Sequence, residues 1–199
     1  GRQWQSPPGG LYLSLALAPH LPAQQAAQLT ICGAWGIATI LRKYDLPVSL
    51  KWPNDLVLSG RKLGGILTET RVKQGCISKA VVGVGINLTN PVPENGINLQ
   101  SFQVNRSSPI LSLETLAAIT LVGIASGYYY WQQEGIDTLL PSYQNLLINM
   151  GRSIQLEGRQ GVVVGVCSDG NLRVNLYPQG AAPSEEISIK PGTISLGYE

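Results

Sequence analysis

Histidine is nearly absent from the sequence, which has a single copy, His20, in 199 residues. Serine hydrolases with a histidine general base and histidine-rich metal centres both depend on this residue type. His20 stands between Pro19 and Pro22, in a stretch typical of a turn between a strand and a helix. Both kinds of site are therefore disfavoured, and any catalysis must depend on lysine, arginine, carboxylates and backbone amides.

Cysteine is also scarce, and its spacing is wrong for a metal site. The three copies, Cys32, Cys76 and Cys167, are odd in number and form no C-x-x-C pair, which disfavours a disulfide framework and a structural zinc site. Long hydrophobic runs are missing too, because the most apolar helical stretch, residues 116–131, is short for a membrane span. We therefore expect reduced thiols in a cytoplasmic protein without membrane contacts.

Charged residues make up only 13% of the chain, about half the usual share, and the net charge is +2. No basic stripe is present, so the composition argues against a nucleic-acid partner. Hydrophobic residues reach 44%, which is enough to bury a core in one domain of ordinary size with a small appendage.

The most informative stretch is residues 51–67, KWPNDLVLSGRKLGGIL. Ser59-Gly60 is typical of a two-residue turn and predicts a hairpin that places Lys62 beside Asn54 and Asp55. A cation next to an oxygen-rich pair, with a Gly-Gly step that lets a ligand approach the backbone, suits an anionic ligand carrying a divalent metal, such as a magnesium-bound nucleotide. On spacing alone, a solvated lysine beside an ordinary loop is the simpler alternative.

A second informative run, residues 80–88, alternates with period two. Gly83, Gly85 and Asn87 then share one face of a strand, and apolar side chains share the other. Glycines on one face leave a flat floor that a ligand can approach, although a second element packed over them would need the same pattern.

These two runs, together with WQSPPGGLYLS at residues 4–14, resemble the catalytic domain of bacterial biotin protein ligases over nearly the whole chain. The resemblance implies an α+β fold, with helices packed on a mixed β-sheet of the class II synthetase-like type and a C-terminal SH3-like barrel. It also implies an ATP-dependent ligase that converts biotin to biotinyl-adenylate and transfers it to a lysine of the biotin carboxyl carrier protein, an acetyl-CoA carboxylase subunit.

The resemblance assigns roles to particular residues. Lys62 would bridge the biotin carboxylate and the α-phosphate, and Asp55 would help to hold magnesium. The remaining expected ligand contacts are Asn54 and Asn87 with the nucleotide, Arg2 with phosphate, Trp4 with adenine, Gly64 and Gly65 with the approaching ligand, and Gly83 and Gly85 as the floor of the biotin pocket.

Hydrophobic periodicity and turn residues predict the remaining elements. The expected strands are residues 11–17, 48–52, a hairpin strand that continues to 72, and 80–88; the expected helices are 23–44, 113–134 and 137–150. Short strands at 153–156, 161–166, 172–176 and 187–189 favour a small barrel. We therefore expect a catalytic domain over residues 1–150 and an SH3-like domain over 151–199.

The sequence departs from the family pattern at both ends. Only Gly1-Arg2-Gln3-Trp4 remains of the family's biotin-contacting Gly-Arg-rich loop, so we expect weak biotin binding by this stretch alone. Gly197 stands where some members carry an arginine that touches ATP. A lipoate ligase and a non-catalytic domain that binds biotin or carrier protein are the alternatives, and a homodimer is left open.

Overall fold

The computed structural model describes residues 6–103, 110, 112–178, 180 and 183–198. Its first body is an antiparallel sheet in the order β1-β6-β5-β4-β3, with the short β2 paired to β6. The strands are β1 (Gly10–Leu17), β2 (Leu21–Pro22), β3 (Ser49–Lys51), β4 (Asp55–Leu58), β5 (Arg61–Lys73) and β6 (Cys76–Asn87). We predicted a mixed sheet, but all pairs of these strands are antiparallel because tight turns join β4 to β5 and β5 to β6. Parallel pairing between described residues is limited to two isolated bridges.

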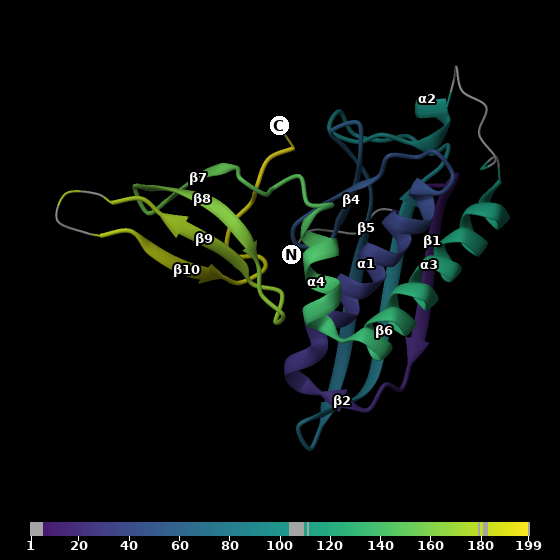
Figure 1. Ribbon diagram of the computed structural model, residues 1–199. Coiled ribbons are helices and arrows are strands. Elements are labelled where there is room, and N and C mark those ends of the chain that lie inside the picture. The colour runs from purple at the N-terminus through teal and green to yellow at the C-terminus, as the bar shows by residue number, and fades with distance from the viewer. Residues whose placement is uncertain (1–5, 104–109, 111, 179, 181–182, 199) are drawn as a thin grey trace.

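Helices cover one face of this sheet (Figure 1). They are the short 3-10 turn η1 (Ala23–Gln25) and the helices α1 (Ala26–Arg42), α3 (Leu113–Glu134) and α4 (Ile136–Gln144), with α2 (Leu99–Gln103) at one end. α1 and α3 touch through glycines, since a Cβ at Gly36 would lie 2.1 Å from the carbonyl oxygen of Gly123. This close approach explains the glycines in two otherwise regular helices. No described helix combines the length and hydropathy that crossing a membrane requires.

Two predicted helix boundaries are confirmed, and one is wrong. The Ser112 hydroxyl caps α3 by accepting from the Thr115 amide at 3.2 Å, and Gly135, with φ of 79°, ends it. The next helix was expected to continue to residue 150, but α4 ends at Gln144. The chain turns away because Leu50 of β3 exchanges backbone hydrogen bonds with Leu146 and Ile148, so sheet pairing replaces helical pairing there.

The second body is an antiparallel sheet in the order β10-β9-β8-β7. Its strands, β7 (Ser153–Leu156), β8 (Arg159–Val166), β9 (Leu172–Leu176) and β10 (Glu185–Ile189), lie close to the predicted ranges. It stands beside the first body, and the chain after β10 returns toward β4 (Figure 1). Contacts between the bodies include the hydrogen bond from Trp52 Nε1 to the Gly170 carbonyl at 2.9 Å and that from the Val166 amide to Gln144 Oε1 at 3.4 Å.

Candidate functional site

The predicted hairpin forms, and it carries Lys62 to Asp55. Ser59 and Gly60, with φ of 50° and 72°, make the left-handed turn that joins β4 to β5. The register then shifts, so that Leu56 pairs with Gly64 but Val57 pairs with Lys62. Lys62 lies on the same face as Asp55 because its partner Val57 is two residues from Asp55, and the extra residue in β5 brings Gly65 rather than Gly64 opposite Asp55.

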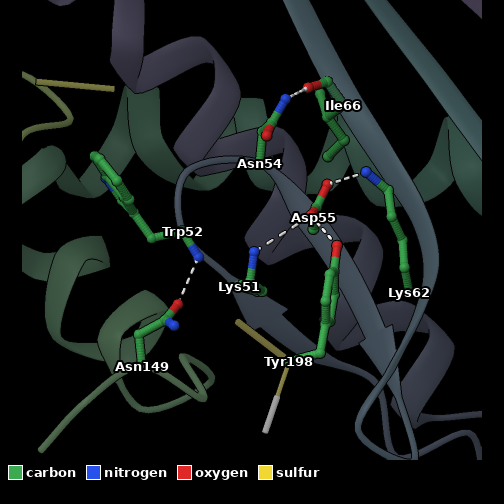
Figure 2. A network of polar contacts seen from close by, with 8 residues as sticks. All are labelled: Lys51, Trp52, Asn54, Asp55, Lys62, Ile66, Asn149 and Tyr198. Atoms are coloured by element: carbon green, nitrogen blue, oxygen red, sulfur yellow. Dashed lines mark hydrogen bonds and ion pairs between the residues drawn. The ribbon is translucent and has the colours of Figure 1, made fainter. Parts of the chain in front are cut away.

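An ion pair results between a buried carboxylate and a more accessible ammonium. Lys62 Nζ lies 2.5 Å from Asp55 Oδ1, and the two side chains are 40% and 8% exposed. Figure 2 shows the two residues facing each other across the hairpin. The simpler alternative, a lysine directed into bulk solvent, is wrong for this structure.

A row of paired positions, two of them glycines, extends from this ion pair across the sheet. Asp55 pairs with Gly65, Gly65 with Gly85, and Gly85 with Tyr12, so the four positions share one face of β4, β5, β6 and β1. A Cβ at Gly65 would lie 3.4 Å from Asp55 Oδ1 and 3.7 Å from Lys62 Cε. The two glycines therefore form a bare strip that ends at the Lys62 ammonium.

The neighbouring row on this face is more open. Gly83 pairs with Ser14 of β1 and with Leu67 of β5, whose side chain is 49% exposed. Val82, Val84 and Ile86, on the opposite face of β6, belong to the core with the helices, whereas on this face Gly83 is half-buried and Gly65 and Gly85 are buried.

Gly64 has a different environment from the other predicted glycines. It pairs with the core residue Ile86, and a Cβ there would lie only 2.2 Å from the Gly85 carbonyl oxygen. The close packing of β5 on β6 is by itself enough to require glycine at this position. We predicted ligand contact here, and the structure places Gly64 outside the strip.

Asn54 and Asn87 lie at opposite sides of the site, and both are held by the chain itself. Asn54 Nδ2 donates to the Ile66 carbonyl at 2.5 Å, which ties the loop before β4 to β5. Asn87 Nδ2 donates to the Ile97 carbonyl at 3.2 Å, and its Oδ1 accepts from Asn90 Nδ2 at 2.8 Å. These bonds fix the orientation of each amide before any ligand binds.

The segment after β6 is more ordered than its composition indicated. Its many proline and asparagine residues are typical of an exposed surface connection, but Asn90 and Asn98 are only 3% and 8% exposed. Asn98 Nδ2 donates to the Asn90 carbonyl, and its Oδ1 caps α2 through the Ser101 amide. A short polar residue can therefore order a loop from within, and composition alone does not reveal this. Residues 104–109 lie outside the described part.

The loop that carries the KWPND motif is held by residues remote in sequence (Figure 2). The Trp52 amide donates to Asn149 Oδ1 at 2.8 Å, and the Trp52–Pro53 peptide bond is cis. Lys51, which is only 7% exposed, lies 3.8 Å from Asp55 Oδ2. Sequence reasoning missed Asn149 altogether and gave Lys51 no role, although Lys51 belongs to the motif.

Tyr198 is the most distant contributor to the site. Its hydroxyl donates a short hydrogen bond to Asp55 Oδ2, and the Lys51 ammonium lies 4.3 Å from the centre of its ring. The two bonded residues are 143 positions apart. No sequence signal identified Tyr198, and its neighbour Gly197 attracted notice only as a departure from a family pattern.

Two features limit what this site can hold. The described residues contain no cluster of three or more His, Cys, Asp or Glu side chains that could bind a metal. A cavity of about 160 Å³ lies near the loop and is lined in part by Trp52, Asn54, Thr68 and Gly170, but Lys62 and Asp55 are not in its wall. The predicted contacts Arg2 and Trp4 lie outside the described residues.

Comparisons with known proteins agree with one another. Residues 1–87 match the Biotin/lipoate A/B protein ligase family. The Bifunctional ligase/repressor BirA of Escherichia coli K12 is 33% identical over 203 residues, covering 98% of this chain and 61% of the relative. A Biotin--[acetyl-CoA-carboxylase] ligase of Paracoccus denitrificans is 35% identical over 99 residues, covering 48% of this chain and 41% of the relative.

The fold is also that of solved structures. A biotin protein ligase from Aquifex aeolicus in complex with biotin and ATP superposes with a TM-score of 0.71 at 23% identity, covering 94% of this chain and 78% of that one. The chain spans about three fifths of the length of the BirA relatives, 61% and 62%.

Proposed function

We propose that this chain is a biotin protein ligase, which activates biotin with ATP and transfers the biotinyl group to a carrier protein; the family match over residues 1–87 and the similar ligases support this. The observation that carries the proposal is the Lys62 ammonium, 2.5 Å from Asp55 at the end of a strip of paired glycines. A carboxylate substrate that lies along the strip brings its charged end to this ammonium.

Joining the biotin carboxylate to the α-phosphate of ATP brings two anions together. The barrier falls when a positive charge is already in place where negative charge grows in the transition state. Lys62 supplies this charge as a compact ammonium on a flexible stem. Its 40% exposure leaves it accessible to substrate, while Asp55 holds it near the strip.

The glycines and amides would position the substrates. Gly65, Gly83 and Gly85 carry no side chain on their shared face, so an apolar ring system would lie directly on the backbone there. Asn54 and Asn87 would meet the nucleotide with amides that are already oriented by hydrogen bonds to Ile66 and Ile97.

Magnesium is compatible with this site as the companion of ATP. The ion commonly keeps several waters and takes one or two protein carboxylates together with substrate phosphates. An ionised carboxylate has about four acceptor positions, so Asp55 retains acceptor capacity beside its contacts with Lys62 and Tyr198. When bound, the metal would neutralise phosphate charge.

The carrier and the domain division are part of the same proposal. The acceptor would be a biotin carboxyl carrier protein of acetyl-CoA carboxylase, the enzyme that appears in the name of the Paracoccus denitrificans relative. Residues 1–150 would form the catalytic domain and residues 151–199 the SH3-like domain, which the antiparallel sheet of β7 to β10 supports.

The test is mass spectrometry of a biotin carboxyl carrier domain incubated with this chain, magnesium, ATP and biotin. We expect one biotinyl increment on one lysine, and lipoate in place of biotin should give none. Lys62→Ala should abolish the increment, whereas Lys73→Ala, an exposed lysine at the far end of β5, should not. A chain that binds biotin without forming biotinyl-adenylate would refute the ligase and support a non-catalytic binding domain.

A further inference from the structure

The chain after β10 leaves the second sheet and ends against the first. Tyr198 lies there with its ring under the Lys51 ammonium, at 4.3 Å, and its hydroxyl on Asp55 Oδ2 (Figure 2). The second body therefore contributes a side chain directly to the carboxylate of the candidate site.

Asp55 is held from two directions. Its Oδ1 is 2.5 Å from the Lys62 ammonium, and its Oδ2 accepts from Tyr198. Lys51 Nζ, at 3.8 Å from Oδ2, is beyond hydrogen-bond distance. Rotation of a carboxylate about its last bond is soft, so of these three side chains only Lys62 and Tyr198 fix its plane by hydrogen bonding.

We propose that Tyr198 is a positioning residue for the reaction: its phenol fixes the Asp55 carboxylate and, through it, the location of the Lys62 ammonium beside the glycine strip. The inference rests on the proposed ligase function. It assigns to the second sheet a defined part in catalysis, namely the orientation of a charged pair on the first sheet. The ring also limits where Lys51 can go, because a cation over an aromatic face is held electrostatically.

The test separates the hydroxyl from the ring. Tyr198→Phe keeps the ring beneath Lys51 and removes only the bond to Asp55, while Tyr198→Leu removes both. A hydrogen bond to a charged group contributes about 1.5–3 kcal/mol, which corresponds to roughly 10- to 100-fold. We expect Tyr198→Phe to lower kcat for biotinyl-adenylate formation about 10-fold with the KM for biotin unchanged. The matched control is Tyr177→Phe, at the end of β9 with a side chain 44% exposed, and it should keep the parent kcat.

A double-mutant cycle checks that the effect passes through Asp55. In an Asp55→Asn background, Tyr198→Phe should lower kcat by no more than a further twofold, because the charged acceptor is already gone. A parent kcat in the single variant, or a full 10-fold additional loss in the double variant, would overturn the inference.

A failure of the positioning role of Tyr198 can be told apart from a failure of the proposed function. If the parent chain forms no biotinyl-adenylate, the ligase assignment fails, and the contact is still tested by urea unfolding of the same four proteins. The shift in the unfolding midpoint of the double variant should then be smaller than the sum of the shifts of the two single variants. Strictly additive shifts would show that the phenol and the carboxylate do not interact, which would overturn the positioning role independently.

Discussion

Gly65 of β5 lies directly opposite Gly85 of β6, and the residue that flanks Gly65 on its other side is Asp55. Two facing glycines in a sheet interior sacrifice the cross-strand packing that normally stabilises a sheet. Under the proposed function, the pair leaves room for the ligand to approach the backbone, and its neighbour Gly64 offers a direct comparison.

Gly64→Ala and Gly65→Ala should have opposite consequences. A methyl at Gly65 makes only ordinary contacts of 3.4 Å or more, whereas at Gly64 it would meet the Gly85 carbonyl oxygen at 2.2 Å. We expect Gly65→Ala to change the free energy of unfolding by less than about 1 kcal/mol but to raise the KM for biotin. Gly64→Ala should lower the free energy of unfolding by about 1–3 kcal/mol, as overpacking does.

Urea unfolding and adenylate kinetics on both variants measure this difference. A stable Gly65→Ala enzyme with the parent KM would remove the strip from substrate binding.

Lys62→Ala should leave the fold intact and suppress the chemical step. The side chain is 40% exposed, so its removal opens no cavity in the core. Loss of one aligned group that stabilises developing charge costs on the order of 10²- to 10³-fold in kcat. The assay is the rate of biotinyl-adenylate formation, with circular dichroism as the check on folding. Lys73→Ala, on the same strand, is the control, and a Lys62→Ala rate within twofold of the parent would contradict the assigned role.

The local parts of the site could be predicted from the sequence. Ser59-Gly60 fixes a hairpin by its turn geometry, and the alternation of glycine with valine in β6 fixes which face is bare. Both signals lie within a few residues of the feature that they determine. The bulge that brings Gly65 opposite Asp55 was not itself predicted, yet the expected neighbourhood of Lys62 and Asp55 was confirmed because the turn limits how far the two strands can slide.

The remote parts could not be predicted. α4 ends early because Leu50, almost a hundred positions earlier, takes the backbone hydrogen bonds of residues 146–148. Tyr198 reaches Asp55 across 143 positions. No periodicity or turn signal encodes such contacts, since they depend on how the second sheet packs beside the first. The SH3-like character of that second sheet therefore stays a prediction.

Asn90→Ala should weaken the site without touching a substrate. Asn90 is 3% exposed and holds Asn87 through a 2.8 Å hydrogen bond, while its own Oδ1 is buried without a hydrogen-bond partner among the described atoms. We expect the KM for ATP to rise as Asn87 loses its fixed orientation, with a loss of about 1–3 kcal/mol in the free energy of unfolding. The control is Asn95→Ala, an exposed asparagine in the same segment. An unchanged KM would show that Asn87 needs no such support.

Cys32 should make the folded chain sensitive to alkaline pH. Burial raises the pKa of its thiol from the ordinary 9.0 to about 12. Below pH 9 the thiol is protonated in both the folded and unfolded chain, so it has no effect on the pH dependence there. Between pH 9 and 12 the unfolded chain ionises this thiol while the folded chain does not, and the free energy of unfolding should therefore fall with rising pH.

The slope of that loss should approach 1.4 kcal/mol per pH unit for this one proton. Urea unfolding at successive pH values measures it, and Cys32→Ala should reduce the slope by that amount even if the variant is less stable overall. Cys76, which is exposed, provides the contrast: its thiol should react with iodoacetamide in the folded protein, while Cys32 should react only after unfolding. Equal slopes in the parent and Cys32→Ala would show that the buried thiol does not govern alkaline stability.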